Sequence, residues 1–255
     1  MSGSKITERL MAAKNAGRKG LIPFLPAGFP DRDSFFAELR SLDEAGADVI
    51  EIGVPFSDPV ADGPVVEQAS LDCLERGVCL SWLLGELSKR KGEYKAALVL
   101  MGYHNPFLKY GFERLAEDAA DAGVSGFIVP DMPFEESDEF REALNKRGLD
   151  LIPLVGLNTP PERMKLYAGK GSGFLYFVSV LGTTGMRDSL PDEIMGKLKE
   201  VKEIFDLPVA LGFGIKTPAQ LENFGDLVDA VVFGSSLIQH IREGGHAGGF
   251  MGAWR

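Results

Sequence analysis

The chain has 255 residues and a formal net charge of −10, with 45% hydrophobic and 25% charged residues. This composition is that of a globular protein, and no apolar run reaches the roughly 18 residues that span a bilayer. A nucleic-acid surface needs a basic patch to displace counterions, so the acidic balance argues against a nucleic-acid partner. The N-terminal segment lacks the apolar stretch of a secretory signal, and we expect a cytoplasmic protein without a membrane association.

Histidine and cysteine are scarce and scattered. Cys73 and Cys79 form no CxxC motif and have no histidine nearby. The three histidines, His104, His240 and His246, show no metal-ligand spacing with each other or with cysteine. We therefore expect reduced cysteines and no metal site.

Short apolar runs alternate with amphipathic segments along the chain. A first amphipathic helix follows Ser4, a candidate N-cap, and a first buried strand at 20–25 ends in a proline-rich turn. The later strands are predicted at residues 49–54, 96–101, 126–130, 151–155, 174–178, 208–212 and 230–233. The helices between and after them are predicted at residues 31–45, 65–76, 82–90, 112–122, 135–147, 161–169, 192–205, 218–223 and 235–242.

Eight successive strand and helix units favour parallel strands joined by helical crossovers. Closed on themselves, they form an α/β fold, a (β/α)8 TIM barrel of about 250 residues. We therefore expect a single domain over residues 1–255 with a short N-terminal helix. A doubly wound open sheet is the weaker alternative, because the chain lacks a dinucleotide-binding GxGxxG motif. The glycine-rich stretch at 244–249 indicates a flexible end.

The most informative segment runs from Val49 to Pro64. Period-two alternation places Glu51 inside an otherwise apolar strand, where a buried carboxylate costs several kcal/mol unless it is paired or protonated. Such a residue is usually kept for chemistry, with a structural network as the alternative. The following loop carries Asp58 and Asp62. Two acids can thus converge on one pocket, although Asp62 also fits an ordinary turn.

Glycines follow three consecutive predicted strands, in Gly182-Thr183-Thr184-Gly185, Gly212-Phe213-Gly214 and Gly234-Ser235-Ser236. Glycine lets backbone N–H groups approach a ligand closely, and the last set opens a helix whose N-terminus favours an anion. Loops after strands seven and eight frequently hold phosphate in this fold. Each motif alone is as often a plain turn, but together they predict a phosphorylated substrate.

Other strand ends give weaker signals. Tyr103 could line a substrate pocket or simply pack, and we keep it as a candidate substrate contact. Asp131 could help to place a ligand or loops, or it could cap a helix or turn before Glu135 and Glu136. The predicted strands contain no interior lysine, which argues against a Schiff-base aldolase, and Lys216 fits a solvated loop charge. Acid–base chemistry by carboxylates remains.

The segment Glu51–Pro64 resembles the signature of the tryptophan synthase alpha subunit family almost throughout. Further motifs recur in the family's order over nearly the whole chain: Pro23-Phe24 with Ala27-Gly28-Phe29-Pro30, Tyr103 with Asn105-Pro106, Pro130-Asp131 with Pro133, Gly182 with Thr184-Gly185, Gly212-Phe213-Gly214 and Gly234-Ser235. Pro26 and Thr183 stand where the family usually has threonine and valine. Neither departure removes a catalytic group.

The resemblance implies a barrel that cleaves indole-3-glycerol phosphate to indole and glyceraldehyde 3-phosphate in tryptophan biosynthesis. It assigns Glu51 as the general acid and base, and Asp62 as the anion that stabilises positive charge at the indole nitrogen. Thr184 would hydrogen-bond Asp62 when its loop closes. The phosphate would be held by Gly185, Gly214, Gly234 and Ser235. The indole would be walled by Leu21, Ile22, Phe213 and Tyr176.

The family also implies a partner. Its members work as an α2β2 complex, in which indole passes to a β subunit that carries pyridoxal phosphate. Asp58 and Pro59 would lie at that interface, and this chain would need no cofactor of its own.

Two alternatives remain open. One is a stand-alone indole-3-glycerol-phosphate lyase, and the other is a non-catalytic phosphate-binding barrel that activates a β partner. The presence of both Glu51 and Asp62 argues against the second. An aldolase or isomerase of another phosphosugar would share the glycine motifs but would not explain the segment from Glu51 to Pro64.

Overall fold

The computed structural model describes residues 4–179, 192–212 and 218–254. Its strands are β1 (Gly20–Pro26), β2 (Val49–Gly53), β3 (Ala97–Met101), β4 (Val124–Ile128), β5 (Asp150–Leu151), β6 (Leu154–Gly156), β7 (Leu175–Val178), β8 (Val209–Gly212) and β9 (Ala230–Phe233). Its α-helices are α1 (Lys5–Asn15), α2 (Phe35–Glu44), α3 (Pro64–Glu75), α4 (Leu80–Ser88), α5 (His104–Tyr110), α6 (Phe112–Asp121), α7 (Asp138–Asn145), α8 (Pro161–Lys170), α9 (Asp192–Ile204), α10 (Ala219–Glu222), α11 (Ser235–Arg242) and α12 (Ala247–Met251). Short 3-10 helices are η1 (Phe134–Glu136), η2 (Gly225–Leu227) and η3 (Gly252–Trp254). Within these ranges no helix combines the length and the hydropathy needed to cross a membrane.

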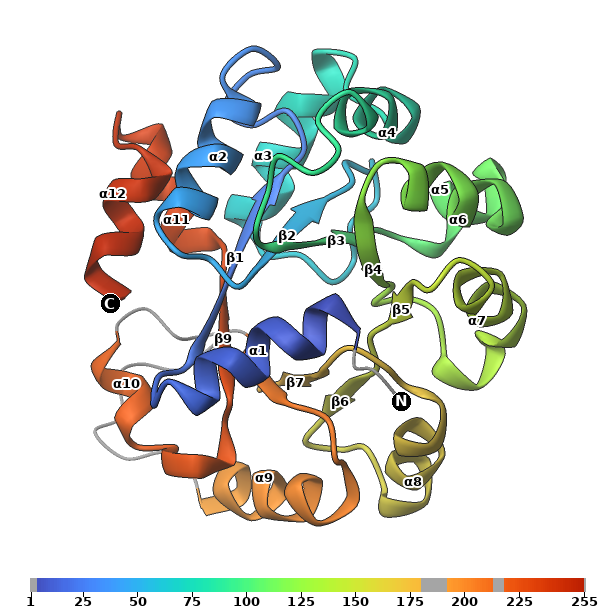
Figure 1. Ribbon diagram of the computed structural model, residues 1–255, viewed down its shortest axis with the longest axis vertical. Helices are drawn as coiled ribbons and strands as arrows, with labels where there is room; N and C mark the ends of the chain where they lie inside the picture. Colours follow the sequence, from blue (N-terminus) through green and yellow to red (C-terminus); the bar gives the residue numbers. More distant parts are fainter. Residues whose placement is uncertain (1–3, 180–191, 213–217, 255) are drawn as a thin grey trace.

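The strands are parallel and closed into a barrel, surrounded by a ring of helices (Figure 1). In strand order β5 and β6 occupy the two ends of the sheet, yet only Ile152 and Pro153 separate them. The Ile152 N–H donates to the carbonyl of Phe127 in β4 at 2.9 Å, and the Pro153 carbonyl accepts the N–H of Tyr176 in β7 at 3.0 Å. The predicted strand 151–155 is therefore one strand in two pieces, interrupted where proline has no N–H to donate. The predicted (β/α)8 barrel is confirmed.

Helix α1 covers the end of the barrel at which the strands begin. Ile6, Leu10 and Ala13 form its fully buried face, and Figure 1 shows the helix lying across this mouth. Ser4 is the N-cap, because its hydroxyl oxygen accepts the N–H of Thr7. The predicted N-terminal helix and its cap are confirmed.

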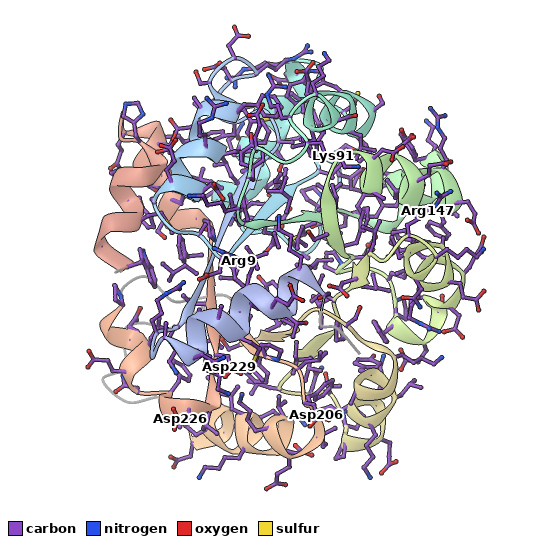
Figure 2. All side chains as sticks on the ribbon, in the orientation of Figure 1. Arg9, Lys91, Arg147, Asp206, Asp226 and Asp229 are labelled. Atoms are coloured by element: carbon purple, nitrogen blue, oxygen red, sulfur yellow. The ribbon has the colours of Figure 1, made fainter. Side chains whose placement is uncertain are left out.

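Buried aspartates tie α1 and the chain that leaves it to the strand starts. Asp48 accepts two hydrogen bonds from the Arg18 guanidinium, at 2.6 and 2.8 Å, and a third from the Leu21 N–H at 3.0 Å. Asp229 precedes β9 beneath α1 (Figure 2) and pairs with Lys14 at 2.9 Å. Both carboxylates are paired, as buried charges must be. These carboxylates stabilise the end of the barrel opposite the cavity described below.

Helix α2 begins four residues later than predicted. The Asp31 carboxylate accepts the backbone N–H groups of Asp33 and Ser34, at 3.0 and 2.9 Å. An aspartate that bonds its following backbone in this way forms a turn before the helix. The chain therefore becomes helical only at Phe35.

The C-terminal tail is folded, and the prediction of a flexible end was wrong. Residues 247–251 form α12, whose Gly248 N–H donates to the Ser41 hydroxyl of α2 at 2.9 Å. A Cβ on Gly248 would lie 2.5 Å from that oxygen. The glycines thus allow a close contact between helices, which outweighs their conformational freedom.

Candidate active site

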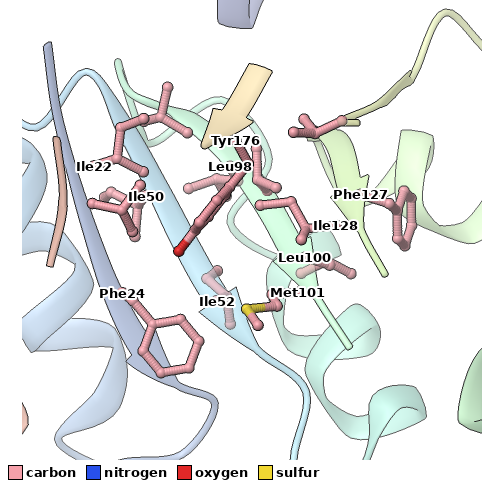
Figure 3. Close-up of a cluster of buried hydrophobic side chains, with 14 of the residues drawn as sticks. Ile22, Phe24, Ile50, Ile52, Leu98, Leu100, Met101, Phe127, Ile128 and Tyr176 are labelled. Carbon is pink, nitrogen blue, oxygen red and sulfur yellow. The ribbon is translucent and has the colours of Figure 1, made fainter. Parts of the chain in front are cut away.

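A cavity of about 550 Å3 opens at the end of the barrel where the strands finish. Apolar side chains form one wall and polar groups converge from several elements, which is the usual make-up of a small-molecule site. The residues that line it are Phe24, Glu51, Asp62, Val65, Val66, Met101, Tyr176, Val232, Phe233, Gly234, Ser235, Ser236, Gln239, His240 and Glu243. In Figure 3 the Tyr176 hydroxyl points into the space between Phe24 and Met101.

Glu51 lies at the centre of β2, with only 1% of its surface exposed. Neither carboxylate oxygen has a hydrogen-bond partner among the described residues. Burial, with a smaller contribution from the Asp62 charge, raises the pKa of Glu51 from 4.5 to about 8. The side chain is therefore protonated at neutral pH and can donate a proton into the cavity.

Asp62 lies in the loop between β2 and α3, two residues before the helix begins. Its N–H donates to the Pro59 carbonyl at 2.9 Å, which fixes the turn. Burial raises the pKa of Asp62 from 3.8 to about 6, while a hydrogen bond with Tyr103 opposes the rise and the Glu67 charge adds to it. At pH 7 the cavity is thus lined by one carboxylate and one carboxylic acid, a combination suited to proton transfer near a stabilised cation.

Tyr103 contacts the loop that carries Asp62. Its hydroxyl oxygen accepts the Ala61 N–H at 3.1 Å, and its ring stacks on Phe56 with centroids 5.3 Å apart. Tyr103 is not among the residues that line the cavity. Its predicted contact with the substrate stays a prediction, and the observed contacts show that it orients the loop carrying Asp62.

The N-terminus of α11 faces the same cavity. Gly234 is the N-cap and Ser235 the first helical residue, and no side chain of the described residues caps the helix. The first-turn N–H groups are therefore available to an anion, which the helix dipole also favours. A Cβ on Gly234 would lie 2.9 Å from the Phe24 ring, so the turn needs glycine here.

Tyr176 completes the part of the predicted site that the structure describes. It lines the cavity from β7, and burial, followed by the charges of Glu51 and Asp62, raises the pKa of its hydroxyl well above 10. Leu21 and Ile22 precede Phe24 on β1 and are not among the lining residues. The other predicted contacts lie outside the described residues: Thr184, Gly185, Phe213 and Gly214.

Asp131 and Asp58 have roles outside the cavity. The Asp131 carboxylate accepts the N–H of His104, the first residue of α5, at 2.8 Å. This contact is made to an element other than the segment at Glu135 and Glu136, for which a capping role was predicted. Asp58 is exposed and accepts a hydrogen bond from Ser57 at 2.6 Å. Pro59 is buried, and Val60 after it is 83% exposed on the same loop. Among the described residues no group of three or more His, Cys, Asp and Glu side chains is placed to hold a metal ion.

Sequence reasoning missed part of the lining. The lining residues not named as site candidates are Phe24, Val65, Val66, Met101, Val232, Phe233, Ser236, Gln239, His240 and Glu243. Gln239, His240 and the C-cap residue Glu243 lie three, four and seven residues after Ser236, a spacing that marks one face of a helix. That periodicity could have identified them once Ser235 was taken as the start of the helix.

The chain matches the family model described as "Tryptophan synthase alpha chain" over residues 10–248. It is 70% identical to the tryptophan synthase alpha chain of Solidesulfovibrio magneticus, with 100% of both chains covered. It is 56% identical to that of Maridesulfovibrio salexigens, again over 100% of each.

Solved structures give the same result. The tryptophan synthase subunit alpha from Legionella pneumophila superposes with a TM-score of 0.88 at 30% identity, covering 99% of this chain and 97% of that one. A chain of tryptophan synthase from Mycobacterium tuberculosis gives a TM-score of 0.90 at 32% identity, with 99% and 97% covered. Sequence and structure therefore agree that the chain belongs to the tryptophan synthase alpha chain family, and like that family it is a lyase.

Proposed function

We propose that Glu51 and Asp62 carry out the retro-aldol cleavage of indole-3-glycerol phosphate in this cavity. The observation that carries the proposal is the state of Glu51, a buried carboxylic acid whose oxygens have no hydrogen-bond partner among the described residues. A buried polar group without a partner costs free energy. The reaction supplies the missing partner, because the substrate has both a carbon to protonate and a hydroxyl to deprotonate.

Glu51 first donates its proton to C3 of the indole ring, which becomes an indoleninium cation. The bond between C3 and the glycerol chain then breaks, and its electrons restore the aromatic indole. The glycerol hydroxyl loses its proton to the Glu51 carboxylate and becomes the aldehyde of glyceraldehyde 3-phosphate. The proton returns to Glu51, so one group serves as acid and base and the cycle needs no cofactor.

Asp62 stabilises the intermediate cation. Its carboxylate is ionised at neutral pH and fixed by the loop before α3, so it can accept a hydrogen bond from the indole N–H as positive charge develops. The phosphate binds at the N-terminus of α11, at Gly234 and Ser235. We also propose that the phosphate and the indole are contacted by Thr184, Gly185, Phe213 and Gly214, which follow β7 and β8 in the sequence and lie outside the described residues.

The proposed partner is a tryptophan synthase β subunit, in an α2β2 complex whose pyridoxal phosphate belongs to the β subunit. Asp58 and Pro59 are proposed to lie at its interface, on the loop that also holds Asp62. The exposure of the apolar Val60 on that loop supports a covering partner. A cytoplasmic location stays a prediction from the sequence.

The function is tested by incubating the purified chain with indole-3-glycerol phosphate, alone and with a β subunit, and following indole and glyceraldehyde 3-phosphate. We expect slow release that accelerates when β is added. Fast release by the chain alone would instead support an independent lyase. Bound substrate without cleavage under both conditions would mean a non-catalytic barrel.

Replacing Asp62 tests the stabilising anion. We expect Asp62→Asn to lower kcat by about a hundredfold to a thousandfold, because the amide keeps the shape but not the charge. The same change should lower the pKa of Glu51, since the Asp62 charge contributes to raising it. Steady-state kinetics across pH measure both effects, and a variant with near-normal kcat would remove Asp62 from the mechanism.

A further inference from the structure

The C-terminal segment 247–254 packs behind the strand end that carries the Gly234 turn. Trp254 stacks on Phe233 with ring centroids 4.5 Å apart and planes 9° apart. Phe250 lies against both rings, with centroids 5.7 Å from Phe233 and 6.4 Å from Trp254. Phe233 is the last residue of β9 and lines the cavity. Phe233, whose ring stacks on Trp254, is therefore directly followed in the chain by Gly234, the first residue of the proposed anion-binding turn.

The turn meets a second aromatic wall on its other side. An added Cβ on Gly234 would approach Phe24 to within 2.9 Å at Cδ1 and 3.1 Å at Cβ. Phe24 belongs to β1, which pairs with β9 as far as Phe233. The position of the turn is thus set by Phe24 and by the Phe233–Trp254 stack together.

The stack is in turn fixed to α2. The Glu38 carboxylate, 6% exposed, accepts the Ala247 N–H at 2.8 Å and lies 3.2 Å from Nδ1 of His246. The Ser41 hydroxyl accepts the Gly248 N–H at 2.9 Å. These contacts satisfy the free N–H groups at the start of α12 and place a carboxylate where the helix dipole favours it. Figure 1 shows α12 beside α2 and α11.

We propose that Trp254 is a positioning residue for the phosphate end of the substrate, acting through Phe233 on the Gly234–Ser235 turn. The inference rests on the proposed function for the identity of the substrate. Hydrogen bonds from backbone N–H groups weaken steeply as distance and angle depart from the optimum. A shift of the turn therefore weakens phosphate binding. Because the phosphate is remote from the reacting carbon, the loss of binding free energy is the same for the substrate and for the transition state.

The test is a split between KM and kcat. In Trp254→Ala we expect KM for indole-3-glycerol phosphate to rise about threefold to tenfold, the scale of one lost aromatic pair, with kcat unchanged within about twofold. The dissociation constant of glycerol 3-phosphate, measured by calorimetry, should rise by the same factor. The pH profile of kcat, which depends on Glu51, should not move. Trp254→Phe keeps an aromatic ring and should recover most of the affinity.

Leu144→Ala is the matched control. Leu144 is fully buried in α7, on the side of the barrel away from α12 (Figure 1). Its truncation leaves a cavity and lowers stability without touching the aromatic stack. Its KM and its affinity for glycerol 3-phosphate should stay at the wild-type values.

A folded Trp254→Ala variant with wild-type KM and wild-type glycerol 3-phosphate affinity would overturn the proposal. An equal rise of KM in Leu144→Ala would do the same. If Trp254→Ala does not fold, Trp254→Leu keeps an apolar side chain but removes the aromatic stack. The same rise in KM and the same loss of glycerol 3-phosphate affinity are expected for it. If the wild-type chain binds glycerol 3-phosphate but does not cleave indole-3-glycerol phosphate, the proposed function fails, and the glycerol 3-phosphate titrations still decide the role of Trp254.

Discussion

Glu51→Gln is expected to lower kcat for indole-3-glycerol phosphate cleavage by at least about a thousandfold, towards the upper range of general acid–base catalysis. Glutamine fills the same space in β2 but neither donates the proton to C3 nor accepts the one from the hydroxyl. Burial and the Asp62 charge hold Glu51 in its acidic form at neutral pH, so the loss should be seen across the neutral range. Indole release, followed with the β subunit present, measures the effect.

Binding distinguishes a chemical role from a structural one. Because the proposed phosphate site at α11 is on another element, Glu51→Gln should bind glycerol 3-phosphate with wild-type affinity. Glu67→Gln is the matched control, since Glu67 is an exposed glutamate on α3 near Asp62. It should keep kcat within a few-fold of wild type. Near-normal cleavage by Glu51→Gln would remove Glu51 from the proposed mechanism.

The barrel could be predicted from the sequence because its signals are local and repeated. Each strand is a short apolar run, and each run is followed by a helical pattern, so the element order follows without any tertiary information. Pro153 shows the limit. Its missing N–H splits the predicted fifth strand into β5 and β6. The sequence alone does not say which neighbouring strand would have accepted that hydrogen bond, so the split could not be predicted.

Composition failed where tertiary contacts decided the outcome. Glycines at 244–249 predict a flexible end, yet the missing side chain of Gly248 is what lets α12 approach Ser41. Propensity is a weak prior that packing overrides. The same segment brings Trp254 against Phe233, a contact between residues that no periodicity relates.

Of the two proposed catalytic residues, Glu51 could be singled out from the sequence, for a different reason. Glu51 is a charged residue type in an otherwise apolar strand. Burying its carboxylate costs free energy, so its presence there indicates a functional role. Asp62 could not be separated from an ordinary turn by its residues alone. Its hydrogen bond with Tyr103 and its position in the cavity depend on two loops folded together.

The burial of Glu51 also makes stability depend on pH. Its folded-state pKa, about 8, lies above its ordinary value of 4.5, so between these values the folded chain binds a proton that the unfolded chain has released. Stability should therefore fall as pH rises through this window, by about 1.4 kcal/mol per pH unit from this group, and level off above pH 8. Asp62, raised from 3.8 to about 6, contributes in the same direction at lower pH.

Glu51→Gln should remove the larger part of this dependence, because the amide has no charge to bury. The variant should match the wild-type melting temperature near pH 5 and exceed it increasingly towards pH 8, by several degrees for a gain of a few kcal/mol in a chain of this size. Thermal unfolding from pH 5 to 8.5 gives the comparison. Glu67→Gln removes only the contribution of the Glu67 charge to the Asp62 pKa, so its melting curve is expected to run parallel to that of the wild type above pH 6. A constant difference between Glu51→Gln and wild type at every pH would mean that Glu51 is not protonated in the folded state, and a proton donor for indole C3 would have to be sought elsewhere in the cavity. A difference in melting temperature that widens with pH would instead show that the buried Glu51 lowers the stability of the chain. A catalytic role for Glu51 would explain why such a destabilising residue is present.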